Sequence, residues 1–227
     1  MVPNRPQIYM SSLDKAFTFD FAFPAKTCQK EVYSQAIESM IPQLFEGYNA
    51  TVLAYGQTGS GKTHSMGTSH GPEDNPEMAG IIQRTVEDMF KEIQSRADEI
   101  NVKVRVSFVE LYREQLYDLL SNKSAKKEEC ICDLREDPIK GVVIPNLTET
   151  SVSSLSSTMH QLELGSHKRV TAATAMNNTS SRSHAIFTLF LDIVNKSDGG
   201  NSRVAKFHLV DLAGSERANK TKATGDR

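Results

Sequence analysis

Residues 51–63 read TVLAYGQTGSGKT, and from Gly56 onward they follow the spacing G-x-x-x-x-G-K-[ST]. The run before the loop, residues 51–55, is short, mostly apolar and without alternation, which predicts a strand buried on both faces. Glycines in such a loop allow backbone N–H groups to turn inward around phosphate oxygens, and the positive end of the following helix faces the same point. The stretch therefore predicts a phosphate-binding loop between a strand and a helix.

The residues of this loop have distinct expected roles. Lys62 would reach the β- and γ-phosphates of a nucleotide, and the hydroxyl of Thr63 would bind Mg²⁺. The phosphate cradle is predicted to consist of Gly56, Gln57, Thr58, Gly59, Ser60, Gly61, Lys62 and Thr63. Because a strand directly precedes the loop, we favour this interpretation over a Gly-rich turn with a surface lysine.

A second stretch supplies the groups that such a loop needs near the metal and the γ-phosphate. Residues 204–209 predict another strand, and the sequence Asp211-Leu212-Ala213-Gly214 follows it. Asp211 would hold Mg²⁺ through water, and the N–H of Gly214 would bond the γ-phosphate.

One motif suggests guanine rather than adenine as the base. Residues 195–198 read NKSD, which matches the N-K-x-D pattern that reads guanine in GTPases. In GTPases this pattern follows D-x-x-G, whereas here it precedes it and lies in the expected turn of a hairpin. Turn chemistry explains Asn, Ser and Asp at such a place, so we expect no guanine recognition.

Apolar spacing along the rest of the chain predicts interleaved helices and strands. A helix is expected over residues 29–46, where Pro42 would kink or end it and Gly47 would cap it. Further helices are expected over residues 82–97 and from residue 153 or 154, strands over residues 17–23, 102–108, 187–193 and 204–209, and a loop over residues 171–183. This order predicts a sheet that helices cover on both faces.

The composition is that of an ordinary globular protein, and 227 residues fit one large domain. Lys and Arg number 26 against 28 Asp and Glu, and the resulting net charge of −2 excludes a globally basic nucleic-acid binder. No apolar run approaches the roughly 18 residues that a membrane span needs. Three cysteines suit a reducing compartment, and Cys130 with Cys132 favours free thiols over zinc because no second pair follows.

Three segments of the chain together resemble one family, the kinesin motor domain. Residues 54–63 are similar to its phosphate loop. Residues 177–184, NNTSSRSH, resemble its first switch, and residues 211–217, DLAGSER, resemble its second switch. The order and spacing of the three segments agree with the family, and the resemblance covers residues 17–227.

The resemblance implies a fold of the P-loop NTPase type, a three-layer α/β domain with a mixed central sheet and helices on both faces. It implies a microtubule motor ATPase that binds ATP and Mg²⁺ and couples hydrolysis to microtubule binding and movement. The implied location is the cytoplasm and its microtubule cytoskeleton. Three basic residues would belong to the surface that meets acidic tubulin: Lys220, Lys222 and Arg227.

The resemblance also implies site residues in the two switches. Ser180 and Ser181 would contact the γ-phosphate and the Mg²⁺ shell when the first switch closes. Arg182 would pair with Glu216 and join the switches, in a charge-assisted pair that is strong only when aligned. Glu216 would also steer the attacking water or accept its proton, and His64 would pack against adenine. The implied catalytic set is Lys62, Ser180, Ser181, Arg182, Gly214 and Glu216, and the implied metal set is Thr63, Ser181 and Asp211.

Both ends of the chain depart from the family pattern. Kinesin motors begin with a central strand that ends R-x-R-P, to which only Arg5-Pro6 is similar here. The flanking residues 47–51 and 220–227 most resemble the chromokinesin group. We expect residues 1–227 to be a partial motor domain without most of the first strand and the C-terminal microtubule-binding helices, and oligomers would form through a stalk outside it.

Two functions from different classes are therefore open. The first is a motor ATPase, and the alternative is a truncated fragment that binds nucleotide or a partner without producing movement. A P-loop enzyme of another kind would require both switch motifs to be coincidences. Phosphate release stimulated by microtubules separates the first two.

Overall fold

The computed structural model describes residues 6–68, 76–122, 127–138, 141–174, 179–197 and 201–216. Their centre is a seven-stranded sheet in the order β3-β11-β10-β4-β5-β6, with β9 also paired to β4. The strands of this sheet are β3 (Ala50–Ala54), β4 (Ile100–Tyr112), β5 (Gln115–Asp118), β6 (Ile131–Cys132), β9 (Thr150–Val152), β10 (His184–Asn195) and β11 (Ser202–Asp211).

The central sheet is mixed, as expected. Strand β11 pairs with β3 in parallel, whereas β10 pairs antiparallel with both β11 and β4. The predicted hairpin of β10 and β11 is confirmed, with ten paired positions from Ala185–Asp211 to Val194–Ser202. Two smaller hairpins lie outside this sheet, β1 (Gln7–Met10) with β2 (Lys15–Thr18) and β7 (Arg135–Asp137) with β8 (Gly141–Val143).

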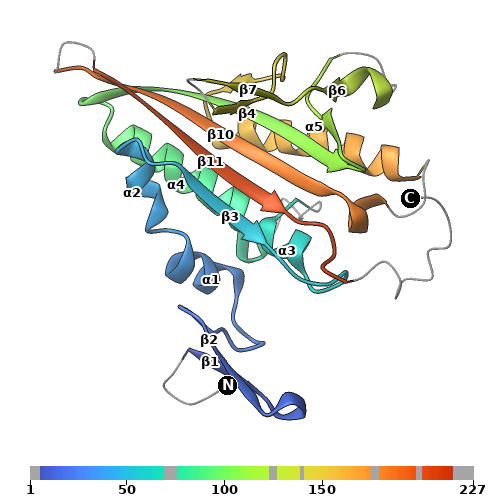
Figure 1. Cartoon of the computed structure of the whole chain (residues 1–227). Helices are drawn as coiled ribbons and strands as arrows, with labels where there is room; N and C mark the ends of the chain where they lie inside the picture. The colour runs from blue at the N-terminus through green and yellow to red at the C-terminus, as the bar shows by residue number, and fades with distance from the viewer. Residues whose placement is uncertain are drawn as a thin grey trace.

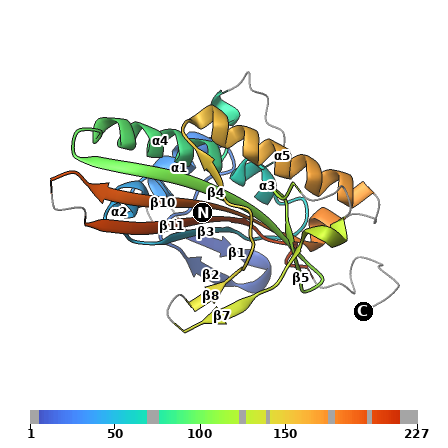
Figure 2. The same cartoon turned by 90° about the horizontal axis from the view of Figure 1, so that it is seen from above.

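All α-helices in the described ranges pack on one face of the sheet (Figures 1 and 2). They are α1 (Gln29–Ala36), α2 (Met40–Phe45), α3 (Lys62–Met66), α4 (Ile81–Ser95) and α5 (Leu155–Thr174). Alternate residues of the long strands, such as Phe108, Phe187 and Phe207, point into the core under these helices and are fully buried. The mixed sheet with helices is as expected, but the described helices cover one face rather than both. None of the described helices is long and apolar enough to cross a membrane.

Strand β3 is buried on one face only, so the prediction of burial on both faces was wrong. Ala50, Val52 and Ala54 turn toward the helices, while Leu53 is 58% exposed on the other side. An apolar run shows that a strand is hydrophobic but does not show which neighbours it has. Among the described strands, β3 lies at one edge of the sheet.

The helix predicted over residues 29–46 is two helices, α1 and α2. The proline ring has no N–H and clashes with the carbonyl four residues earlier, so a continuous helix cannot run through Pro42. A new helix that begins at Met40 places Pro42 in the first turn, where a missing N–H costs little. Gly47 follows α2 with φ +92° and donates its N–H to the Leu44 carbonyl at 3.0 Å, which confirms the predicted cap.

Two further predictions changed. The alternating phenylalanines do not form one half-buried strand, because β2 ends at Thr18 and Phe17, Phe19 and Phe21 are 42–49% exposed. A two-stranded hairpin apart from the main sheet has too little surface to bury them. The loop expected over residues 171–183 begins later, since α5 continues to Thr174 and residues 179–182 form a 3₁₀ turn.

Helix α5 lies unusually close to strand β4. A Cβ atom on Gly165 would collide with the ring of Phe108, so only glycine permits this approach. The close approach sets the position of the last turns of α5, which carry Arg169 toward the site described next.

Candidate nucleotide and magnesium site

The predicted phosphate loop connects β3 to α3. Gly59 and Gly61 have φ angles of +78° and +93°, in the left-handed region that favours glycine. A Cβ atom at either position would meet nothing within 4 Å, so these glycines are required by the backbone conformation rather than by lack of space. Positive φ angles at two glycines agree with the tightly turned backbone that the sequence predicts for a phosphate-binding loop.

Lys62 folds back over the loop. Its Nζ donates to the carbonyl oxygens of Gly56 and Gln57, at 2.9 Å in each case. A hollow of about 170 Å³ lies beside it, lined among others by Tyr55 and Ser60. The ammonium group thus lies over the loop on which the sequence predicts phosphate binding.

Two of the predicted metal residues, Thr63 of α3 and Asp211 at the end of β11, lie together. Parallel pairing places Asp211 of β11 beside Ala54 of β3, so the carboxyl ends of both strands meet at the loop. Thr63 Oγ1 donates to Asp211 Oδ2 at 2.7 Å. Asp211 is 2% exposed, and its Oδ1 is buried without a hydrogen-bond partner among the residues that the structure describes. A hydroxyl and a carboxylate with one unsatisfied buried oxygen fit Mg²⁺, which prefers oxygen ligands.

Sequence reasoning missed a buried arginine that contacts this pair. Arg169 of α5 lies 3.4 Å from Asp211 Oδ2 through Nη1 and 3.6 Å from Glu110 Oε1 through Nε. Its Nη2 donates to the carbonyl and the hydroxyl of Ser183. We call Glu110, Arg169, Ser183 and Asp211 the buried cluster. Thr63 is exposed and contacts this cluster through Asp211, so the contacts connect the phosphate-loop helix, the sheet, α5 and the segment before β10.

Replacing Arg169 by methionine should lower the free energy of unfolding by about 3–5 kcal/mol, because two buried carboxylates lose their cation. Chemical denaturation followed by circular dichroism measures the change. Arg105→Met is the matched control, since Arg105 also contacts two carboxylates, Glu149 and Asp192, but its side chain is 32% exposed. For that variant we expect about 1 kcal/mol or less. If both variants lost the same free energy of unfolding, burial would not be the reason for the larger effect expected at Arg169.

The second predicted switch lies along the phosphate loop. Leu212 N donates to the Ala54 carbonyl at 3.2 Å, and Ser215 N donates to the Gly56 carbonyl at 3.0 Å. The N–H of Gly214, predicted to bond the γ-phosphate, donates to the carbonyl of Ser181 at 2.8 Å. The two switches and the phosphate loop are therefore joined by backbone hydrogen bonds.

Glu216 contacts the phosphate loop rather than the first switch. Its Oε2 accepts from the Thr58 N–H at 2.9 Å, and its Oε1 accepts from the Thr58 hydroxyl. The hydrogen bonds from Thr58 hold the pKa of the Glu216 carboxyl below its ordinary value, with a smaller contribution from the charge of Lys62. The carboxylate is therefore ionised at neutral pH, and the contact weakens only when acid protonates it.

The predicted pair of Arg182 and Glu216 does not form in this structure. Both residues lie within the described ranges, and Arg182 is exposed at the end of the 3₁₀ turn. The pairing stays a prediction for a different arrangement of the switches. The side chain of Ser180 lies outside the described part, as do Lys220, Lys222, Arg227 and Arg5.

His64 is exposed on α3, as packing against a base requires, and its carbonyl accepts from Gln29 Nε2 at 2.7 Å.

The N-K-x-D motif of residues 195–198, which suggested guanine, begins far from the phosphate loop. Strand β10 has twelve residues, so Asn195 at its end lies about 36 Å from His184, whose ring accepts from the Ala213 N–H at 3.1 Å. Lys196 instead bonds the carbonyls of Ala97 and Glu99 after α4, a structural role.

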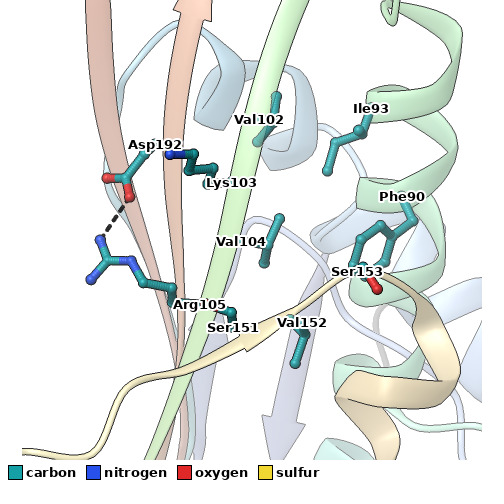
Figure 3. Close-up of a pocket in the computed structure, with 10 residues that line it drawn as sticks. All are labelled: Phe90, Ile93, Val102, Lys103, Val104, Arg105, Ser151, Val152, Ser153 and Asp192. Carbon is teal, nitrogen blue, oxygen red and sulfur yellow. Dashed lines mark hydrogen bonds and ion pairs between the residues drawn. The ribbon is translucent and has the colours of Figure 1, made fainter.

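A larger hollow of about 340 Å³ lies at another edge of the sheet (Figure 3). It forms because β9 pairs with β4 only at residues 104–106, so the start of β4 has no described strand on that side. Phe90, Ile93 and Val102 line one wall, and the ion pair of Arg105 and Asp192 lies beyond the strand. Apolar and charged side chains both line this hollow, and none of the predicted site residues is among them.

Comparison with known protein families gives a match over almost the whole chain. The model of the family described as "Kinesin motor domain" matches residues 5–227. "Chromosome-associated kinesin KIF4" of Mus musculus is 48% identical over 227 residues, which is 100% of this chain and 18% of that protein. "Kinesin-like protein KIF27" of Homo sapiens is 43% identical over 236 residues, with 16% of its length covered.

A solved structure is similar as well. It is described as "Structure of a fast kinesin: Implications for ATPase mechanism and interactions with microtubules". It matches with a TM-score of 0.85 and 37% identity, over 94% of this chain and 58% of that chain. The chain thus spans less than a fifth of the curated relatives and somewhat more than half of the solved one.

Proposed function

The chain belongs to the kinesin motor domain family, and from this we propose that it binds and hydrolyses ATP with Mg²⁺ as part of a microtubule motor. The observation that carries the proposal is the hydrogen bond between Thr63 and the buried Asp211, beside a glycine loop that Lys62 covers. Asp211 Oδ1, which is buried and has no hydrogen-bond partner among the described residues, supports the proposal because a bound cation would satisfy it.

We assign the steps of nucleotide binding to the residues of the loop. The N–H groups of residues 56–63 would bind phosphate oxygens, and Lys62 would leave the two carbonyls it now contacts to meet the β- and γ-phosphates. Thr63, Ser181 and Asp211 would hold Mg²⁺, which neutralises negative charge on the phosphates when bound. His64 would pack against the adenine.

Hydrolysis is assigned to the switches. Ser180 and Ser181 would contact the γ-phosphate, and Gly214 would exchange the Ser181 carbonyl for a phosphate oxygen. Glu216 would orient the attacking water, directly or through a second water, after leaving Thr58 for Arg182. The backbone bond between Gly214 and Ser181 supports this exchange because it already holds the two switches side by side.

Microtubules are the proposed partner, and the cytoplasmic cytoskeleton is the proposed location. The experiment is phosphate release from ATP by the chain, measured with and without microtubules. A motor ATPase should release phosphate slowly alone and faster with microtubules, in proportion to their concentration until saturation. Nucleotide binding with no stimulated release would instead support the alternative, a fragment that binds nucleotide or a partner without movement.

A further inference from the structure

The carboxylate of Glu216 occupies donors of the phosphate loop. Both of its oxygens accept from Thr58, one from the backbone N–H at 2.9 Å and one from the hydroxyl. The backbone N–H groups of such a loop are the donors that bind phosphate oxygens in proteins of this type. A side-chain anion therefore holds a position that suits a phosphate anion.

The same carboxylate lies against Gly214. A Cβ atom built on Gly214 would collide with both carboxylate oxygens of Glu216 and with the Thr58 hydroxyl. Gly214 is the residue to which we assign the γ-phosphate, so the carboxylate lies at the end of the loop where a third phosphate would bind. Its low pKa, which Thr58 and Lys62 cause, keeps it negatively charged at neutral pH.

We propose that Glu216 competes with the terminal phosphate of a nucleoside triphosphate for the Thr58 donors, and so determines how well the site distinguishes a triphosphate from a diphosphate. This inference rests on the proposed nucleotide binding. Two anions cannot share one set of donors, because like charges at such a distance repel each other. A triphosphate must therefore displace Glu216, whereas a diphosphate, which has no third phosphate, leaves the contact with Thr58 in place.

The displaced carboxylate has a second partner close by. Arg182 directly follows Ser181, whose carbonyl is bonded to Gly214, two residues before Glu216. Arg182 is exposed and makes no ion pair with Glu216 in this structure, within the described ranges. Exchange of Glu216 from Thr58 to Arg182 would therefore couple the presence of a third phosphate to closure of the two switches.

The experiment measures equilibrium binding of Mg·ADP and of a non-hydrolysable Mg·ATP analogue by calorimetry. In Glu216→Ala, the affinity for the ATP analogue should rise about tenfold relative to that for ADP, as expected for loss of a competing charge-assisted contact. Thr58→Val keeps the N–H and removes the hydroxyl, so it should give a smaller rise. Asp20→Ala removes an exposed carboxylate near the N-terminus of the chain, so it should leave the ratio of the two affinities unchanged.

The outcomes separate this inference from the proposed function. Retained ADP binding shows that a variant is folded, and an unchanged ratio in both Glu216→Ala and Thr58→Val would then overturn the competition. If Glu216→Ala fails to bind ADP, the ratio in Thr58→Val alone decides. If the unmodified chain and Asp20→Ala bind neither nucleotide, the proposed nucleotide binding itself fails.

Discussion

Replacement of Lys62 by alanine is expected to abolish ATP turnover and to lower the affinity for ATP by at least about a hundredfold. The ammonium group of Lys62 is the cation of this loop that can contact the β- and γ-phosphates and stabilise the negative charge that develops on them. In the structure it is also bonded to the carbonyls of Gly56 and Gln57, so its removal loosens the loop itself. Calorimetry with ATP and a phosphate-release assay measure the two effects.

Two control variants show which property of Lys62 matters. Lys62→Arg keeps the charge but not the compact ammonium group, so we expect weakened binding that stays detectable. Lys26→Ala removes an exposed lysine far from the loop in sequence and should change neither affinity nor turnover. Near-normal turnover in Lys62→Ala would refute the assignment of the phosphate loop.

Glu216→Ala is expected to keep ATP binding and to reduce hydrolysis by roughly 10³-fold, in line with the loss of other groups that act in the transition state of phosphoryl transfer. The carboxylate is the base or the water-orienting group that we assign, so the chemical step should slow while binding persists. Single-turnover hydrolysis separates the two, because it measures the chemical step apart from product release. Unchanged hydrolysis would refute the role of Glu216 in the reaction.

The partner of Glu216 in the transition state can be tested in the same assay. If Glu216 moves to Arg182 when a triphosphate binds, Arg182→Ala should slow hydrolysis in a similar way, and the double variant should be little slower than either single one. Residues that act as a unit give such non-additive effects. Additive losses would show that the two residues act separately.

The loop and its metal residues could be predicted from the sequence because their chemistry is local. Glycines with positive φ, a lysine and a hydroxyl must follow one another at fixed spacing, so eight consecutive residues contain the signal. Asp211 could be found since it follows a strand, and strand ends meet at one edge of a sheet. The structure places Thr63 and Asp211 in contact, as this reasoning expects.

Arg169 could not be found in this way. In the sequence it is one of several charged residues on a polar helix, and such residues usually face solvent. Its burial depends on the close approach of α5 to β4, which Gly165 permits, and on Glu110, which is 59 residues earlier in the chain. A charged residue four positions from a glycine within a helix is the weak signal that was present.

The contact between Glu216 and Thr58 could likewise not be predicted from the sequence. The resemblance to kinesins implied a pair with Arg182, which describes one arrangement of the switches. The contact with Thr58 depends on how residues 212–216 lie along residues 54–58, and no spacing rule predicts that. The burial of β3 on one face could not be predicted for the same reason, because the hydrophobicity of a strand does not show which elements pack against it.

The buried cluster also restricts how this sequence can change over generations. Glu110, Arg169, Ser183 and Asp211 are separated along the sequence, yet a change in one charged member leaves another charge buried without compensation. Replacing all the charged members together with apolar residues of similar volume would avoid that cost but would remove the proposed metal site. Stepwise loss of the proposed nucleotide site would therefore pass through an intermediate less stable than either end point.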